Sequence, residues 1–498
     1  MMSDSIPSVR VQACNSAAVD ASGDFVLYWM TANRRRHWNF ALQRAVHWAE
    51  ELRRPLLVVE GLSCEYRWAN ERIHVALLQG MLENLRNFDG SAALYYPFVE
   101  RFPGQGMGMM AALAERSCLV VTDDFPASEI PGWISVVAAR SPVLVEKVDS
   151  NGIFPMRSTN RVFTTAHSFR RFLQKELRPH LEEFPLEDPL ADVELPAAVC
   201  PAWLRERWPE ATEHELSSAK FLAASVPIDH FVAPASNFAG GARAARDCLK
   251  NFVRNGLNHY VETRNQPEAE TSSRLSPYLH FGHISAHEVF RSVSAAAHWS
   301  PEKLNPKTTG SREGWWGAGP DAEAFLDQLV TWREIGFNMC AHSGNYAAYD
   351  SLPVWARKTL SDHRADLRHV LYTPEQIEFA TTHDALWNAA QSQLLEEGRI
   401  HNYLRMLWGK KILEWSPTPE VALATMIDLN NKYALDGRDP NSYTGIFWTL
   451  GRYDRPWAPE RPIFGTIRYM SSDNTARKLR VKDYVQRHAT EHRILAKG

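Results

Sequence analysis

The sequence predicts an α/β domain with a parallel, Rossmann-like sheet, followed by an all-α domain. Short apolar runs alternate with amphipathic stretches in the first third of the chain. A proline-rich, acidic segment follows, and from about residue 215 apolar residues recur every three to four positions. Alternating strands and helices form a parallel sheet, whereas the later spacing is typical of helices. We expect the α/β domain over residues 20–175, a linker over 176–214 and the helical domain over 215–498.

Five apolar runs are the expected strands, at residues 25–30, 55–60, 93–97, 118–122 and 143–148. The stretches 38–52 and 72–88 between them have the apolar spacing of amphipathic helices. Strands separated by helices of this length are joined by crossovers and therefore pair in parallel. Helical spacing continues at residues 323–337, 375–395, 402–415 and 419–429.

Two stretches have weak periodicity. Residues 180–203 are rich in proline and acidic side chains and are interpreted as a linker over a surface. Residues 299–320 are rich in proline, glycine and lysine, which predicts a long surface loop.

Composition excludes several classes of protein. The net charge is −3, so nucleic-acid binding would need a local basic patch on a near-neutral protein. Six dispersed cysteines form no C-x-x-C pair, which argues against a zinc site or a disulfide framework and favours a cytoplasmic protein. The chain has no signal peptide or run of about 20 apolar residues, so no membrane contact is expected.

Common catalytic motifs are also missing. The sequence contains no phosphate-binding G-x-x-x-x-G-K-[ST] loop, no H-E-x-x-H zinc motif and no G-x-S-x-G elbow, and no metal is expected. The string GQGMGM at 104–109 lacks the glycine spacing of a dinucleotide fingerprint and is predicted to be a loop.

Tryptophan is abundant, with 17 residues, and three of them share one region. Trp408 and Trp415 are seven residues apart, which puts them on one helix face about 10 Å apart along the axis. Trp387 lies on the preceding helical stretch and can pack between them. Three close tryptophans can pass an electron from the surface to a buried acceptor, and plain core packing is the alternative.

Three further segments suit a ligand with a polar edge and phosphates. Residues 429–457 carry many charged groups between aromatics, and Arg405 with Asp436 can form an ion pair that holds a ring; ordinary surface turns are the alternative. Hydroxyl residues from Thr271 to Ser276 precede a helix, as in an anion site or an ordinary N-cap. The basic C-terminal segment 461–482 is suited to a phosphate backbone or to solvent.

Longer strings in these regions resemble the class II cyclobutane pyrimidine dimer (CPD) photolyases of the photolyase/cryptochrome family. They are SRLSPYLHFG, THDALWNAAQ, YLRMLWGKKILEW, LDGRDPNSYTGI and DRPW…RPIFG…RYM. The resemblance covers the chain from about residue 20 and is strongest after residue 271. It implies an antenna-type α/β domain, a helical domain that binds FAD and DNA, and the activity of a deoxyribodipyrimidine photo-lyase, a carbon–carbon lyase.

The resemblance also assigns residues. Those that resemble contacts to the FAD phosphates are Tyr260, Ser272, Ser273, Arg274, Leu275 and Ser276. Arg405 and Asp436 resemble the ion pair beside the isoalloxazine, and Asn430 resembles the residue near flavin N5. Trp387, Trp408 and Trp415 resemble the photoreduction triad. Those that resemble the lesion-binding set are Arg264, Trp332, Met406, Trp448 and Arg455.

One position departs from the family pattern. A glutamate lies four residues before the tryptophan that corresponds to Trp332 in the family, and here that position is Gln328. An amide can donate a hydrogen bond but cannot donate or relay an acidic proton. Glutamine at this catalytic position also resembles (6-4) photolyases and cryptochromes.

The expected function is light-driven repair of CPDs, in which excited reduced FAD passes an electron to a dimer flipped out of double-stranded DNA. The alternatives are a cryptochrome-type photoreceptor, a photolyase with altered lesion preference, or a flavin-independent DNA-binding module. The resemblance also implies a second antenna chromophore, 8-hydroxy-5-deazaflavin or methenyltetrahydrofolate. A monomer is expected.

Overall fold

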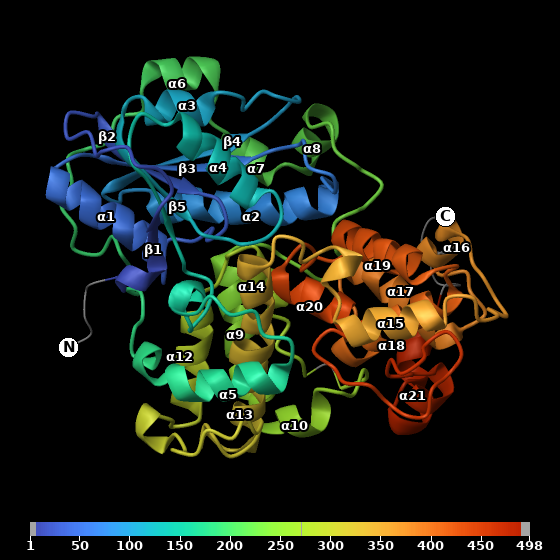
Figure 1. Cartoon of the computed structure of the whole chain (residues 1–498). Helices are drawn as coiled ribbons and strands as arrows, with labels where there is room; N and C mark the ends of the chain where they lie inside the picture. Colours follow the sequence, from blue (N-terminus) through green and yellow to red (C-terminus); the bar gives the residue numbers. More distant parts are fainter. Residues whose placement is uncertain (1–5, 270, 490–498) are drawn as a thin grey trace.

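The computed structural model describes residues 6–269 and 271–489 and consists of an α/β half and a helical half that lie against each other (Figure 1). The sheet has six strands in the order β1-β6-β5-β2-β3-β4. All neighbouring pairs are parallel except β1 with β6. The strands are β1 (Val11–Ala13), β2 (Phe25–Met30), β3 (Leu56–Leu62), β4 (Ala93–Val99), β5 (Ser117–Asp123) and β6 (Val145–Val148).

The expected parallel sheet is confirmed because all five apolar runs form strands within two residues of their predicted bounds. Every residue of β2 and β5 is buried, as expected for strands covered on both faces. The antiparallel edge strand β1 was not predicted, since three residues are too few to show an alternating pattern.

Helices cover both faces of the sheet (Figure 1). Helices α1 (Phe40–Leu52) and α2 (Glu71–Phe88) lie on one face, and α1 begins at Asn39, whose side chain accepts the amide N–H groups of Ala41 and Leu42. The other face is covered by α3 (Met109–Ala114), α4 (Ile130–Arg140) and α6 (Ala202–Arg207).

The segment between the two halves contains short helices. Helix α5 (Ala166–Glu176) packs in the core of the helical half, where Phe169 and Leu173 are buried, whereas α6 packs on the sheet. The divisions at residues 175 and 215 stay predictions from the sequence. The remaining short helices here are α7 (Glu213–Ser217) and α8 (Ala219–Ser225), with 3-10 turns η2 (Met156–Ser158) and η3 (Arg178–Leu181). A further 3-10 turn, η1 (Ser8–Arg10), precedes β1.

The helical half is built as expected from its apolar spacing. Its helices are α9 (Ala242–Asn255), α10 (Tyr260–Thr263), α11 (Ser276–His280), α12 (Ala286–Ala296), α13 (Pro320–Leu326), α14 (Arg333–His342), α15 (Val354–Asp362), α16 (Pro374–Glu378), α17 (Ala385–Glu397), α18 (Asn402–Trp415), α19 (Pro419–Tyr433), α20 (Pro440–Thr449), α21 (Ser472–Lys478) and α22 (Lys482–Arg487). Short turns η4 (Leu257–His259), η5 (Pro301–Lys303) and η7 (Tyr349–Ser351) join some of them. No helix among the described residues is long and apolar enough to cross a membrane.

Two predicted helices are interrupted. The stretch 323–337 contains a π-helical turn, η6 (Asp327–Trp332), between α13 and α14. The stretch 375–395 is two helices, because α16 ends at Glu378 and Ala380 adopts a left-handed backbone with φ of 58°. Helix α17 then begins after Asp384, whose side chain accepts the amide N–H of Trp387. Apolar spacing alone does not reveal such a break.

The loop 299–320 is not simply a surface loop. It buries Trp299, Trp315 and Trp316 under the helical half, so this expectation was wrong for its tryptophans. The buried carboxylate of Glu323 accepts the amide N–H groups of Gly314 and Trp316 at 2.7 and 2.6 Å. Although the segment is rich in lysine and proline, it packs against the helical half through its three buried tryptophan side chains.

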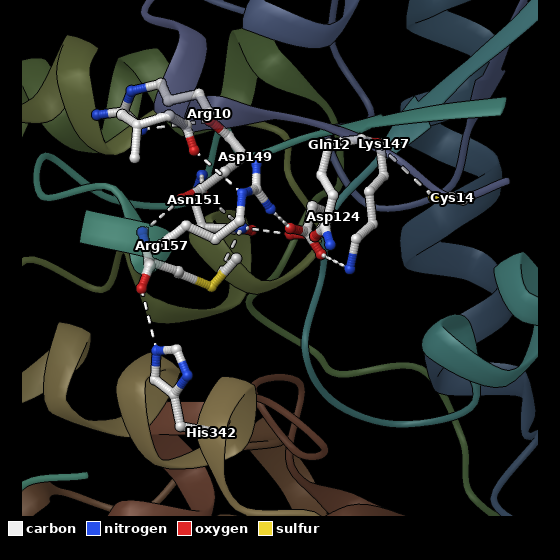
Figure 2. Close-up of polar contacts among 11 residues, drawn as sticks. Arg10, Gln12, Cys14, Asp124, Lys147, Asp149, Asn151, Arg157 and His342 are labelled. Carbon is white, nitrogen blue, oxygen red and sulfur yellow. Dashed lines mark hydrogen bonds and ion pairs between the residues drawn. The ribbon is translucent and has the colours of Figure 1, made fainter. Parts of the chain in front are cut away.

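Polar contacts join the N-terminal segment and the sheet to the helical half (Figure 2). The fully buried Arg10 donates to the carbonyl groups of Asp149, Gly152 and Ile153. Nearby, Asp124 pairs with both Lys147 and Arg157 (Figure 2). The ring of His342, from α14, donates from Nε2 to the carbonyl of Met156 at 3.1 Å. The loop after β6 is thereby fixed against α14.

Candidate functional site

Helices α17 to α20 pack together and bring the three predicted tryptophans into one chain of contacts. All three are buried, and Trp387 has no exposed surface. The indole N–H of Trp387 donates to the carbonyl of Trp408 at 3.0 Å, and its ring centroid lies 5.2 Å from that of Trp415 in an edge-to-face arrangement. Trp387 therefore lies in contact with both of the others, as the spacing predicted.

The outer end of this chain carries two residues that the sequence did not reveal. The half-buried Tyr372 has its ring centroid 5.2 Å from Trp415, and exposed His383 lies 5.6 Å from the same indole. The Tyr372 hydroxyl also forms a short hydrogen bond with Nδ1 of His383. Tyr372 lies two residues before α16, and His383 lies in the break between α16 and α17, which no sequence pattern predicted. At the inner end, the indole N–H of Trp408 donates to Gln391 at 2.8 Å.

The ion pair expected between Arg405 and Asp436 is present, with Nη2 3.1 Å from Oδ1. Arg405 comes from α18, and Asp436 comes from the turn after α19. Gly437 lets that turn approach α19 closely, because a Cβ there would lie 2.7 Å from the carbonyl oxygen of Asn430. The buried amide of Asn430 donates to Ser442 Oγ at 2.7 Å. A carboxylate, a guanidinium and an amide are thus held on three adjacent elements.

The segment expected to contact phosphates lies at the start of α11. Tyr260 and Leu275 are buried, residues 272–274 are half-buried, and Ser276 is exposed. A small cleft here is lined by Thr271, Ser272 and the cationic side chains of Arg399 and Arg487. The hydroxyl of Thr271 is buried without a hydrogen-bond partner. Hydroxyls beside guanidinium groups are suited to a pyrophosphate, so these residues fit the phosphates of a dinucleotide such as FAD.

The cleft also contains His401, the residue before α18. Burial lowers its pKa to about 4, so the imidazole is neutral at physiological pH and its buried Nδ1 has no partner in the structure. The positive charge at this cleft therefore comes from the two arginines.

Gln328 and Trp332 both lie on the π-helical turn η6 and are half-buried. Such turns inside α-helices are frequent at functional sites. The turn is anchored by Asp327, whose carboxylate receives two hydrogen bonds, at 2.6 and 2.9 Å, from Arg170 of α5. This ion pair is buried on both sides.

The other residues expected at the lesion come from three further elements. Met406 on α18 and Trp448 on α20 are half-buried, and Trp448 packs on the same hydrophobic core as Trp332. Arg264 follows α10 with its guanidinium 5.8 Å from the ring of Tyr260. Arg455 is exposed and lies 4.8 Å over Trp457; within the described part of the chain, no hydrogen bond, ion pair or cation–π contact joins it to the other five.

A cavity of about 680 Å³ lies between the carboxyl end of the sheet and the helical half. Apolar side chains such as Trp29, Phe98 and Trp133 line it, together with the predicted loop at 104–109. The helical half contributes His280, Phe281 and Arg438. Arg438 follows Asp436 by two residues, so one turn faces both this cavity and the Arg405 site.

An α/β domain of this topology joined to a helical domain is the architecture of photolyases and cryptochromes. The structure is similar to a class III photolyase from Agrobacterium tumefaciens, with a TM-score of 0.67 over 95% of this chain and 86% of that one, at 16% identity. It is also similar to a cryptochrome from Synechocystis, with a TM-score of 0.62 over 93% and 88% of the two chains, at 14% identity. These likenesses establish the fold.

Sequence comparison establishes the family. The chain is 32% identical over 487 residues to a deoxyribodipyrimidine photo-lyase of Methanothermobacter thermautotrophicus, covering 97% of this chain and 98% of the relative. It is 35% identical to the enzyme of that name from Oryza sativa, covering 93% and 87%. No family model matches the sequence. The chain belongs to the deoxyribodipyrimidine photo-lyases of the photolyase/cryptochrome family, which are DNA repair flavoproteins.

Proposed function

We propose that the protein repairs cyclobutane pyrimidine dimers in double-stranded DNA, using light and electron transfer. The observation that supports this most directly is the contact of Trp387 with Trp408 and Trp415 beside the Arg405–Asp436 ion pair. A chain of tryptophans that ends at a polar ligand site is suited to passing electrons to a buried redox cofactor. Reduced FAD, when bound and excited by light, supplies the electron that opens the dimer's cyclobutane ring.

The chain's own residues would hold the cofactor in two places. The hydroxyls of Thr271 and Ser272, with Arg399, would bind its phosphates, and Tyr260 would pack beside them. Arg405, Asp436 and Asn430 would surround the ring, and Asn430 is already oriented by its hydrogen bond to Ser442. A side chain that is fixed before the ligand binds loses little conformational entropy on binding.

Electrons would pass inward along the three tryptophans. Trp415 lies outermost, with exposed His383 and half-buried Tyr372 against it, and Trp387 is in contact with both Trp415 and Trp408. The proposed order is therefore Trp415, Trp387, Trp408, cofactor.

A dimer flipped from the duplex would stack on aromatic side chains. Trp332 and Trp448 are half-buried on one core, and Met406 belongs to the adjacent helix α18. Stacking of a base on an aromatic ring contributes about 1–3 kcal/mol. Arg264 and exposed Arg455 would contact phosphates without reading the base sequence.

We also propose that the 680 Å³ cavity binds a second, light-harvesting chromophore. Its volume lies within the range of cofactor pockets, and it is mainly apolar with a few charged groups, including Arg34 and Arg438. A deazaflavin or a folate suits such a lining. The absorbance of a chromophore released from purified protein by denaturation would identify which of them is bound, and purification with one flavin alone would contradict the proposal.

Gln328 supports a second candidate, namely a different lesion preference or a signalling role. Its side chain is half-buried on the π-helical turn, four residues before Trp332. A carboxyl at this position can donate a proton to the lesion, whereas an amide donates only hydrogen bonds.

Repair under blue light tests the proposal. Purified, photoreduced protein is mixed with a thymine-dimer oligonucleotide, and the return of base absorbance is followed in light and in darkness. Recovery in light alone supports CPD repair. A flavin-containing protein that photoreduces without repairing this lesion contradicts it, and a (6-4) oligonucleotide then distinguishes altered preference from signalling.

The Gln328→Glu variant provides the matched comparison. If the amide limits repair, this variant repairs more dimers per absorbed photon than the wild-type protein. Equal yields would show that the amide of Gln328 supports repair as well as a carboxyl does at this position.

A further inference from the structure

Lys410 is a buried cation that forms no ion pair with a carboxylate among the residues that the structure describes. It lies on α18 two residues after Trp408, and its side chain has no exposed surface. Its ammonium donates to the carbonyl of Thr449, the last residue of α20, at 2.5 Å. In the described part of the chain, no ion pair includes Lys410, whereas its neighbour Lys411 pairs with Glu414 at 2.9 Å. A buried charge of this kind is costly, so its retention calls for a specific reason.

The ammonium lies beside Trp448, the proposed lesion contact. Its Nζ is 5.4 Å from the centre of the Trp448 ring, which is within the range of cation–π attraction. The exposed Arg468 also approaches this indole, with its guanidinium carbon 5.6 Å from the ring centre. Trp448 is therefore contacted by one buried cation from α18 and by one exposed cation from the C-terminal segment.

The same ammonium also lies at the carboxyl end of α20. The last carbonyl groups of a helix carry partial negative charge, so a cation there is favourable. Gly409 permits this approach, because a Cβ at that residue would lie 2.6 Å from the Thr449 methyl group. The position of Lys410 thus depends on the close crossing of α18 and α20.

We propose that Lys410 is a positioning residue, whose ammonium holds the end of α20 and the indole of Trp448 in the orientation that receives a flipped pyrimidine dimer. This inference rests on the proposed function, because the contact of Trp448 with the lesion is itself proposed. When Lys410 is deprotonated, its neutral amine no longer attracts the Trp448 ring or the carboxyl end of α20 electrostatically. The orientation of Trp448 is then less strongly held.

This role makes lesion binding depend on pH. The pKa of Lys410 is lowered to about 7, mainly by burial; Asp454 opposes this shift and nearby Arg468 adds to it. The ammonium is present below this pKa and is lost as the pH rises through it. Affinity for dimer-containing DNA should therefore fall above about pH 7.

The test measures the dissociation constant of the flavin-containing protein for a labelled thymine-dimer duplex in darkness, across this pH range. We expect Lys410→Met to bind about tenfold more weakly below pH 7, a change of about 1.4 kcal/mol. We also expect it to lack the wild-type decline above pH 7. Lys358→Met, which removes an exposed lysine paired with Asp362, should keep the wild-type profile. Lys410→Arg, which keeps the charge, should bind more tightly than Lys410→Met at high pH.

A double-mutant cycle separates this inference from the proposed function. If Lys410 acts through Trp448, then Lys410→Met has no further effect in a Trp448→Ala background. Additive effects, or a wild-type affinity that does not change with pH, overturn the inference while Trp448 remains the lesion contact. If Trp448→Ala alone binds like the wild type, both the lesion contact and the inference fail. The wild-type pH profile needs no variant, so the test stands even if a variant does not fold.

Discussion

At the scale of single residues, Trp387 determines whether the tryptophan chain is continuous. It is the fully buried indole that contacts both Trp408 and Trp415. We predict that Trp387→Phe greatly slows light-driven reduction of the bound flavin by an external reductant, because phenylalanine is far harder to oxidise than tryptophan. Repair by chemically reduced protein should persist. The smaller ring and the lost N–H donor should cost roughly 1–3 kcal/mol of stability.

Flavin absorbance during illumination measures this prediction. Trp48→Phe is the matched control, since Trp48 lies on α1 and donates its indole N–H to Glu146, far from the chain of tryptophans in sequence and fold. Photoreduction of Trp387→Phe at the wild-type rate would show that the three indoles are core packing alone.

Glu334 is the second residue whose environment has a measurable consequence. It follows Trp332 by two positions, and its carboxylate accepts the amide N–H groups of Ile153 and Phe154 at 2.7 and 3.1 Å. Burial raises its pKa to about 8, against the opposing effects of Arg333, these two amides and Arg10. The folded protein thus holds a proton that the unfolded chain releases near pH 4.5.

We predict that the stabilising contribution of Glu334 is full below about pH 4.5 and is lost as the pH rises through about 8. Glu334→Gln, which cannot titrate, should show a flatter decline of unfolding free energy over this window in urea titrations. Glu323→Gln is the control, because it also replaces a buried carboxylate that accepts backbone N–H groups. An unchanged pH dependence in Glu334→Gln would disprove the assignment.

At the scale of elements, the crossing of α14 and α20 is the contact that matters most for the proposed lesion site. Helix α14 begins directly after Trp332, and α20 carries Trp448, so this crossing sets the distance between these two helices. Gly336 lies at this crossing, and a Cβ there would lie 2.6 Å from both the carbonyl oxygen of Pro440 and the hydroxyl of Thr444. A backbone oxygen has little room to move. We predict that Gly336→Ala destabilises the protein by roughly 1–3 kcal/mol through overpacking and weakens lesion binding.

Gly132→Ala is the control for this prediction. Gly132 also lies in a helix, α4, but nothing lies within 4 Å of a Cβ at that position. Alanine there should be neutral or stabilising by about 0.5–1 kcal/mol, because it favours the helix. Equal effects of the two substitutions on thermal unfolding would mean that the α14–α20 crossing can relax.

Strands and helices were predictable from the sequence where a local pattern of apolar residues defines them. The five apolar runs became strands, and Asn402–Trp415 has its predicted bounds as α18, because its apolar spacing is regular. The π-helical turn at Gln328 was not predictable, since Arg170 anchors it from a place distant in sequence. The break at Ala380 was not predictable either, because the apolar spacing continues across it. The Arg405–Asp436 pair was predicted, whereas Tyr372, His383 and Lys410 became candidates only when the fold placed them beside Trp415 and Trp448.

At the scale of the whole molecule, the proposed functions depend on how the two halves meet. The loop after β6 is bonded to Glu334 of α14, and α14 follows directly from the turn that carries Gln328 and Trp332. The 680 Å³ cavity takes one wall from the sheet and another from Arg438, next to the Arg405–Asp436 pair. A change in the packing of the halves should therefore affect both candidate sites.

One side chain that joins the two halves through several hydrogen bonds is Arg72, on α2 of the α/β half. It is buried, and its guanidinium donates to four carbonyl groups, those of Ala233, Leu394, Leu395 and Tyr433. Three of these lie near the carboxyl ends of α17 and α19, where partial negative charge favours a cation. One arginine thus satisfies the end carbonyls of two helices that carry Trp387 and Asn430.

We predict that Arg72→Met destabilises the protein by roughly 3–5 kcal/mol, because it leaves several buried carbonyl groups without donors. The loss should appear in thermal unfolding and also as weaker retention of the flavin, since α17 and α19 are no longer held against the α/β half. Arg86→Met is the matched control on the same helix, because Arg86 and its partner Glu213 are both exposed. That substitution should change stability by less than about 1 kcal/mol. If Arg72→Met unfolds at the same temperature as Arg86→Met, the halves are held together by their apolar contacts and not by this arginine.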